Sequence, residues 1–180
     1  MKTICSIFTL LLLLATGIPA AAQELSLDQL TKLGTLPTDL PLQKMTALLL
    51  PPGWTYRGHV NQTDELYWTA GDKVTVGDET LDEAWLSLRP MPNGTMDVLY
   101  KTLPGGGAEG LQREVKHLKL ANIAVTCLEC EGVRYDADSY TISFYSHKKK
   151  GYPNIVVLHQ APAQSAPGKG TGTASSSSGN

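Results

Sequence analysis

Apolar residues recur at helical spacing in two segments near the start of the chain. The first follows Ser26 and Gln29, which have the order and separation of a capping box, and it runs to Gly34. The second has Pro41 in its first turn and is ended by Pro51, because proline cannot continue a helix. The pattern predicts helix, turn, helix. The apolar stripes of these helices are Leu27, Leu30 and Leu33, then Leu42, Met45, Leu48 and Leu49.

From Trp54 onward the period changes to two, which is typical of half-buried strands. The clearest example places Met96, Val98 and Tyr100 on one side of a strand that leaves the turn at Asn93. The segment 80–84 is consistent with a strand or with a short helical turn. The strands predicted in this half are 54–60, 66–68, 84–89 and 94–100, with an exposed hairpin excursion at 73–76.

A glycine-rich break at 104–107 is followed by a third helical pattern. Leu111, Val115 and Leu118 fall on one face of this helix, and Asn122 is its predicted stop. The glycines partly fit a nucleotide-binding loop, but no Gly-Lys-Ser/Thr follows and the preceding strand is predicted to be antiparallel, so we expect a plain connector. Strands are then predicted at 123–127, at 133–135, at 140–145, and from Tyr152 or Ile155 to His159.

The order of elements repeats: a helix followed by three or four antiparallel strands occurs twice. We therefore predict an α+β fold in which a tandem helix plus antiparallel-strand repeat forms one curved sheet with helices on one face. The other sheet face is then left partly open. The residues predicted to line this binding surface are aromatic: Trp54, Tyr56, Tyr67, Trp68, Trp85 and Tyr145.

The two ends of the chain differ in composition from the middle. Residues 1–22 have a positive Lys2, an apolar run and an Ala-Ala-Ala end, which predicts a secretory signal peptide. Residues 161–180 are mostly Ala, Pro, Gly, Ser and Thr, which predicts a disordered low-complexity tail. We expect a single α+β domain at 23–160, no transmembrane anchor in the mature chain, and a secreted or periplasmic location.

Charge and cysteine content limit the kinds of partner and site that we expect. Without Lys2, one of the 15 basic residues, the predicted mature chain carries 14 basic and 17 acidic residues, a net charge of −3, which argues against a nucleic-acid partner. Cys127 and Cys130 predict a local disulfide in an oxidising compartment. A redox pair, or half of a metal site completed by His147 and His159, stays open as the alternative. We find no motif for a cofactor, no metal-ligand spacing and no catalytic constellation.

Several segments also carry a resemblance to known proteins. The signal-peptide end with Leu25–Leu30, Gly53-Trp54, Val98–Thr102, Leu111–Val115 and Tyr140–Tyr152 is similar to exported proteins of Bacteroidetes-type bacteria that have no assigned activity. The resemblance covers nearly the whole mature domain and implies no activity. The doubled helix–sheet order is loosely similar to the β-lactamase inhibitor protein fold, whose concave sheet grips a partner protein.

These observations predict an exported, non-enzymatic binding or interaction module that acts through its sheet face or its aromatic loops. The partner that we expect is another protein or a cell-envelope component. The alternative is a thiol-redox or metal-binding protein that uses Cys127 and Cys130.

Overall fold

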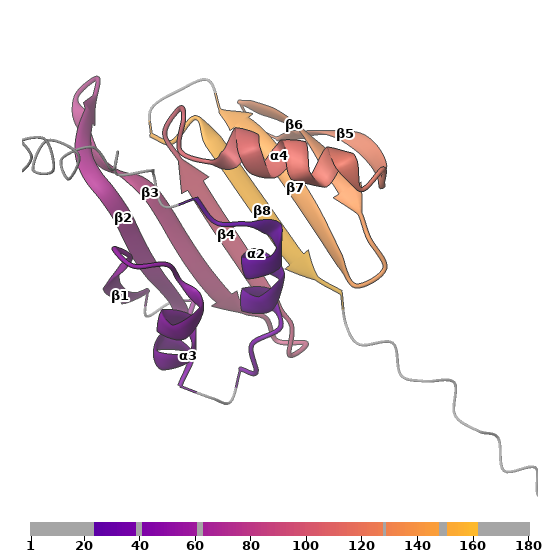
Figure 1. The fold of residues 1–180 in the computed structure, drawn as a ribbon, viewed down its shortest axis with the longest axis horizontal. Coiled ribbons are helices and arrows are strands. Elements are labelled where there is room, and N and C mark those ends of the chain that lie inside the picture. Colours follow the sequence, from indigo (N-terminus) through magenta and orange to yellow (C-terminus); the bar gives the residue numbers. More distant parts are fainter. Residues whose placement is uncertain (1–23, 39–40, 61–62, 128, 148–150, 162–180) are drawn as a thin grey trace, which may run out of the picture.

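The structure is a computed structural model that describes residues 24–38, 41–60, 63–127, 129–147 and 151–161. The predicted signal peptide, residues 148–150 and the predicted tail from residue 162 on lie outside these residues. The helices and strands of the described part are shown in Figure 1: α2 (Leu27–Gly34), α3 (Leu42–Leu49), β1 (Thr55–Val60), β2 (Glu65–Val76), β3 (Glu79–Pro90), β4 (Met96–Thr102), α4 (Ala108–His117), β5 (Ala121–Cys127), β6 (Cys130–Asp136), β7 (Tyr140–His147) and β8 (Asn154–Gln160).

All eight of these strands join one sheet in the order β1-β2-β3-β4-β8-β7-β6-β5, and every neighbouring pair is antiparallel. Strands β1 to β4 form one meander and β5 to β8 form a second, and the two meet where β4 pairs with β8. The predicted α+β class with an antiparallel sheet is confirmed. The helical turn considered for residues 80–84 is wrong, because these residues continue β3 opposite β2.

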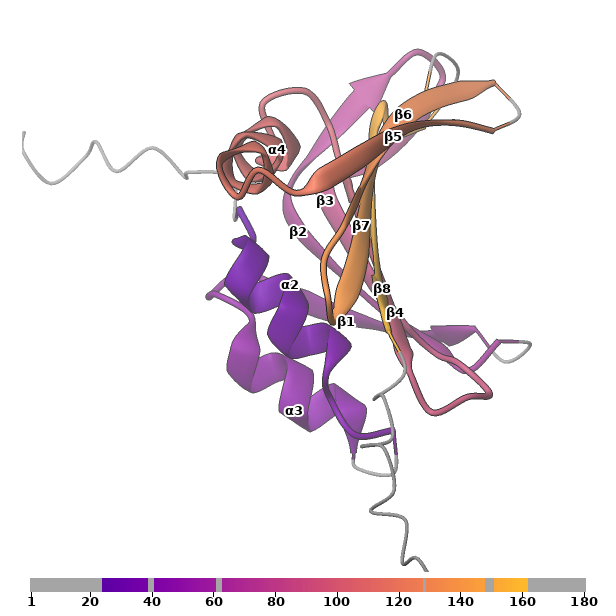
Figure 2. The same cartoon turned by 90° about the vertical axis from the view of Figure 1, so that its right-hand side faces the viewer.

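Helix α2 begins at the predicted capping box. The Ser26 backbone N–H donates to Gln29 Oε1 at 3.0 Å, and the Gln29 N–H donates to Ser26 Oγ at 3.2 Å. The helix packs over the central strands β4 and β8 and contacts both α3 and α4. Figure 2 shows α2 between α3 and α4.

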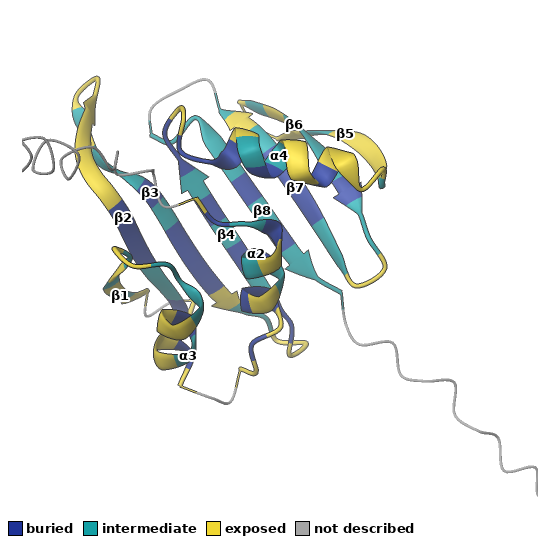
Figure 3. Ribbon diagram, viewed as in Figure 1, coloured by how far each residue is buried: buried dark blue, intermediate teal, exposed yellow. Residues whose placement is uncertain are grey.

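The core lies between these helices and alternate residues of the strands. Met96, Val98 and Tyr100 of β4 are buried, as their period of two predicts. Because burial disfavours the charged phenolate, the pKa of Tyr100 lies well above its usual range, and its hydroxyl donates to the Gly106 carbonyl oxygen at 2.8 Å. Figure 3 shows buried segments along the central strands, whereas β5 and the β2–β3 tip are exposed.

Helix α4 is shorter than the sequence predicts. Leu111 and Val115 are buried, but Leu118 is 49% exposed and lies beyond the last helical residue. Lys119 has a left-handed backbone conformation, φ 54°, which ends the helix. Asn122, the predicted stop, is therefore already part of β5.

The glycine-rich segment before α4 is a connector within an antiparallel sheet. β4, which precedes it, is antiparallel to both β3 and β8, so the parallel strand–helix–strand unit of a dinucleotide-binding loop is missing. Gly107, with φ 93°, caps α4, and a Cβ there would meet Glu24 at 2.7 Å. The glycine therefore allows a tight turn against Glu24, which agrees with the plain connector that we expected.

Candidate functional site

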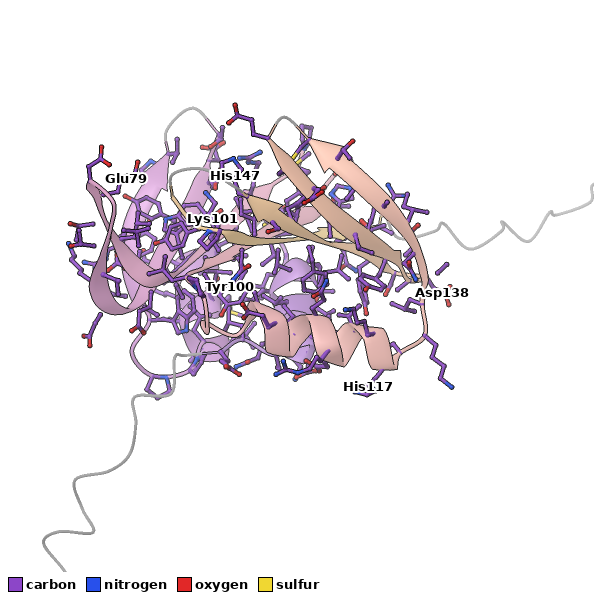
Figure 4. The ribbon with its side chains drawn as sticks, turned by 90° about the horizontal axis from the view of Figure 1, so that it is seen from above. Glu79, Tyr100, Lys101, His117, Asp138 and His147 are labelled. Carbon is purple, nitrogen blue, oxygen red and sulfur yellow. A yellow bond between two sulfur atoms is a disulfide. The ribbon has the colours of Figure 1, made fainter. Side chains whose placement is uncertain are left out.

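The sheet face opposite the buried core carries a set of interacting polar and aromatic side chains. Successive strand residues point to opposite faces, so Lys101 lies on this side because Tyr100 faces the core (Figure 4). We call this side the outer face. By register it comprises Glu65, Tyr67, Thr69, Trp85, Ser87, Arg89, Asp97, Leu99, Lys101, Gly132, Arg134, Asp136, Thr141, Ser143, Tyr145, Ile155, Val157 and His159.

Two aromatic rings and an ammonium group pack side by side on the outer face. The rings of Tyr67 and Trp85 stack with centroids 5.9 Å apart and planes at 25°. Lys101 Nζ lies 4.2 Å from the centroid of the Trp85 ring, within the range of a cation–π interaction. Burial lowers the pKa of Lys101, and nearby Glu65 opposes that shift. The three side chains come from adjacent strands β2, β3 and β4, so the sheet holds them in fixed positions.

A charged pair next to these rings is partly removed from water. Arg89 donates through Nη2 at 2.7 Å and through Nε at 3.1 Å to Glu65 Oε2, and Ser87 Oγ donates to Glu65 Oε1. The Glu65 side chain is 8% exposed and that of Arg89 is 46% exposed. Burial raises the pKa of Glu65, but the hydrogen bonds from Ser87 and Arg89 and the charges of Arg89 and Lys101 outweigh it, so the pKa falls below 4.5. Glu65 is therefore ionised at neutral pH.

Further charges continue across the same face. His159 Nδ1 contacts the Asp97 carboxylate from the neighbouring strand, and Arg134 Nε lies 2.9 Å from Asp136 Oδ1. Leu99 and Val157 face each other between these charges. The outer face thus combines apolar, aromatic and paired charged groups.

Three of the six predicted aromatic residues lie on this face. Tyr67 and Trp85 form the ring stack, and Tyr145 lies opposite Gly132 of β6. A Cβ at Gly132 would meet the Phe144 carbonyl oxygen at 2.1 Å and the Tyr145 ring at 3.0 Å, so only glycine fits beneath that ring. An aromatic side chain across from a strand glycine covers the backbone that the glycine leaves bare.

The other three predicted aromatic residues lie on the helix side. Trp68 is 2% exposed, with Tyr56 packed on it at a centroid distance of 5.3 Å, and Trp54 packs on Tyr100 at 6.2 Å. The prediction that Trp68 is exposed is wrong: the alternation of β2 turns Trp68 toward the core and Tyr67 away from it. Adjacent aromatic residues have equal strand preference, so composition alone does not tell which of the two faces outward.

A groove of about 410 Å³ lies between α3 and this second aromatic group. Its lining includes Lys44, Pro51, Pro52, Trp54 and Tyr56. The Trp54 Nε1 atom is buried and, within the described chain, has no hydrogen-bond partner.

The outer-face residues that sequence reasoning missed include Glu65, Ser87, Arg89, Asp97, Lys101 and His159. A signal for most of them exists: Ser87 and Arg89 alternate with Leu86 and Leu88, so they belong on the face opposite the core. What the sequence does not give is the register that sets β2 and β8 beside them.

The cysteine pair lies at the end of the β5–β6 hairpin. Cys127 and Cys130 face each other across the two strands, their Cα atoms are 5.0 Å apart and their sulfur atoms are in contact, which is the arrangement of a local disulfide. His147 lies opposite Cys130, but His159 contacts Asp97 elsewhere, so the four residues do not form one ligand set. Across the described ranges, no cluster of three or more His, Cys, Asp or Glu side chains is arranged to bind a metal ion.

Comparisons with protein-family models, with curated proteins and with solved structures gave no match to this chain. The resemblances to exported proteins of Bacteroidetes-type bacteria and to the β-lactamase inhibitor protein fold therefore stay predictions. In the described part of the chain, none of the helices has the length and apolar character needed to cross a bilayer.

Proposed function

We propose that this chain is an exported, non-enzymatic binding module that recognises a protein or a cell-envelope component through the outer face of its sheet. In this proposal two helix-plus-strand repeats form one curved sheet with helices on one face, and the module acts in the periplasm or outside the cell. The observation that carries the proposal is the stack of Tyr67, Trp85 and Lys101 beside the Glu65–Arg89 pair. Aromatic residues and arginine are enriched where proteins bind partners.

The side chains of the outer face are preorganised for binding. The Tyr67 and Trp85 rings and the Arg89 guanidinium are held by strands rather than by loops, so little conformational entropy is lost when a partner covers them. Leu99 and Val157 add apolar surface on the same face, and the paired charges orient a bound partner. The aromatic groove beside α3 is a second surface of the same kind. The contact between Cys127 and Cys130 is given a structural role, which is to hold the β5–β6 hairpin together.

Affinity capture from a cell-envelope extract tests the proposal with three variants. Trp85→Ala removes the ring stack, Lys101→Glu reverses the charge beside it, and Leu48→Ala is the matched control because Leu48 is 80% exposed on α3. We expect a partner that the wild type and Leu48→Ala retain and that both outer-face variants lose, with circular dichroism showing that each variant is folded. If the outer-face variants retain the same proteins as the wild type, the outer face is not the binding surface.

A further inference from the structure

The edge of the sheet at β5 has features that are independent of the outer face and of the proposed function. β5 is the last strand in the sheet order, so its outer side pairs with no other described strand. The seven residues Ala121–Cys127 contain no charge, no proline and no glycine, and they pair with β6 at every position without a bulge. A regular, uncharged edge of this kind presents backbone N–H and C=O groups to any further strand.

The opposite edge of the sheet is built differently. β1 has a bulge between Tyr56 and Gly58, and Gly58 has a φ of 134°. Arg57 and His59 place basic side chains along it, and Arg57 Nε donates to Thr69 Oγ1 at 2.8 Å. Bulges and charged residues are the features by which proteins prevent further pairing at a sheet edge. The β1 edge therefore has features that prevent further strand pairing, whereas β5, the edge strand of the second meander, has neither a bulge nor a charged residue.

The hairpin geometry shows which backbone groups of β5 face outward. Cys127 and Cys130 close a two-residue turn, so the backbone groups of Cys127 face β6. Alternate residues of a strand turn their backbone groups to opposite sides, and therefore Asn122, Ala124 and Thr126 present theirs to the free edge. The middle one of these, Ala124, is also the middle residue of the strand.

This edge is complementary to a second copy of itself. When two β5 strands run antiparallel about a two-fold axis at Ala124, Asn122 faces Thr126 of the second copy and Ile123 faces Val125 of the second copy. All three outward-facing residues then form ladder pairs, and Ile123, which is 47% exposed, gains a β-branched neighbour on the outer face. The same register places no like charges face to face along the strand, because Ala121–Cys127 carries no charged residue.

We propose that two copies of the chain pair through β5 to form a dimer with one continuous sheet. A closed two-fold arrangement uses the same patch on both copies, as is usual for homodimers. The interface is confined to two short strands and is smaller than the ~1,200 Å² of stable complexes, so the dimer is reversible and depends on protein concentration.

The two-fold position of Ala124 provides a specific test. Ala124→Lys and Ala124→Glu each place like charges directly opposite each other, whereas an equal mixture of the two places opposite charges there. Ala124 is exposed, so neither change disturbs the core. The control is Thr75→Lys, which adds the same charge to an exposed position at the far end of β2.

Sedimentation velocity over a range of concentrations gives the dimer dissociation constant. We expect a dimer for the wild type and for Thr75→Lys, a dissociation constant raised about tenfold or more in each Ala124 variant alone, and recovery in their mixture. Unchanged thermal unfolding midpoints show that the variants are folded. A wild type that stays monomeric overturns the proposal, and so does a dimer that both variants retain, or a mixture that does not recover. The outer-face variants Trp85→Ala and Lys101→Glu leave the dimer intact, so the two proposals fail independently.

Discussion

Removal of the Arg89 side chain tests the electrostatics of the outer face most directly. In Arg89→Ala the Glu65 carboxylate, which is 8% exposed in the wild type, loses both charge-assisted hydrogen bonds, at 2.7 and 3.1 Å, and keeps only the one from Ser87. Loss of one partner from a fully buried pair costs about 3–5 kcal/mol. Arg89 is 46% exposed and its attraction to Glu65 is screened by water, so we expect a loss of about 1–3 kcal/mol at pH 7.

The sign of the pH dependence follows from the lowered pKa of Glu65. In the wild type the ionised carboxylate stabilises the fold at pH values above its unfolded pKa of about 4.5, and this contribution is lost as the pH falls through the lower folded pKa. In Arg89→Ala the pKa of Glu65 is expected to rise relative to the wild type, because the hydrogen bonds and the charge of Arg89 no longer lower it while burial still raises it. The two proteins therefore differ most in stability near neutral pH and become more similar in acid, once Glu65 is protonated in both.

Urea unfolding at pH 7 and at pH 4, followed by circular dichroism, measures this difference. The variant Glu65→Gln is the matched control, because an amide in place of the carboxylate removes the charge while it keeps the shape. Adding Arg89→Ala to Glu65→Gln is expected to cost less than Arg89→Ala costs in the wild type. An equal loss of stability at both pH values, or an equal loss with and without the Glu65 charge, would refute this account.

Three further expectations concern stability. Trp68→Ala removes a buried ring and is expected to cost about 3–5 kcal/mol in urea unfolding, clearly more than Trp85→Ala on the outer face; equal losses would contradict the assignment of the two faces. Gly132→Ala places a Cβ 2.1 Å from a carbonyl oxygen and lowers the thermal midpoint, whereas an unchanged midpoint means that β6 and β7 shift apart freely. Replacement of Cys127 and Cys130 by serine opens a four-residue loop and is expected to cost about 2 kcal/mol, and a wild-type intact mass that is two hydrogens light checks that the bond exists.

Much of the local structure follows from the sequence pattern because local forces determine it. The capping box at Ser26 and Gln29 marks the start of α2, since both hydrogen bonds lie within one turn. The alternation of Met96, Val98 and Tyr100 gives the buried side of β4 directly. These features need no information about distant parts of the chain.

Other features depend on partners that are far away in sequence. Leu118 continues the helical spacing of α4, yet the left-handed Lys119 leaves it outside the helix. The outward side chains of β3 are predictable, but Glu65 becomes their partner only through the pairing of β2 with β3. The candidate site was therefore predicted only in part. The rings of Tyr67 and Trp85 carry a sequence signal, but which charged residues lie beside them depends on the register of the strands.

The meeting of the two meanders has a consequence for how the chain folds. β4 gains its second neighbour only when β8 is present, since Val98 pairs with Leu158, sixty positions later. Contacts of such long sequence separation form slowly, because a long loop must close before they contribute. Until β8 has been synthesised, one side of β4 therefore stays unpaired at the edge of the first meander. In a chain that is cut before Asn154, this side of β4 never gains a partner strand. We expect such truncated chains to aggregate through β4.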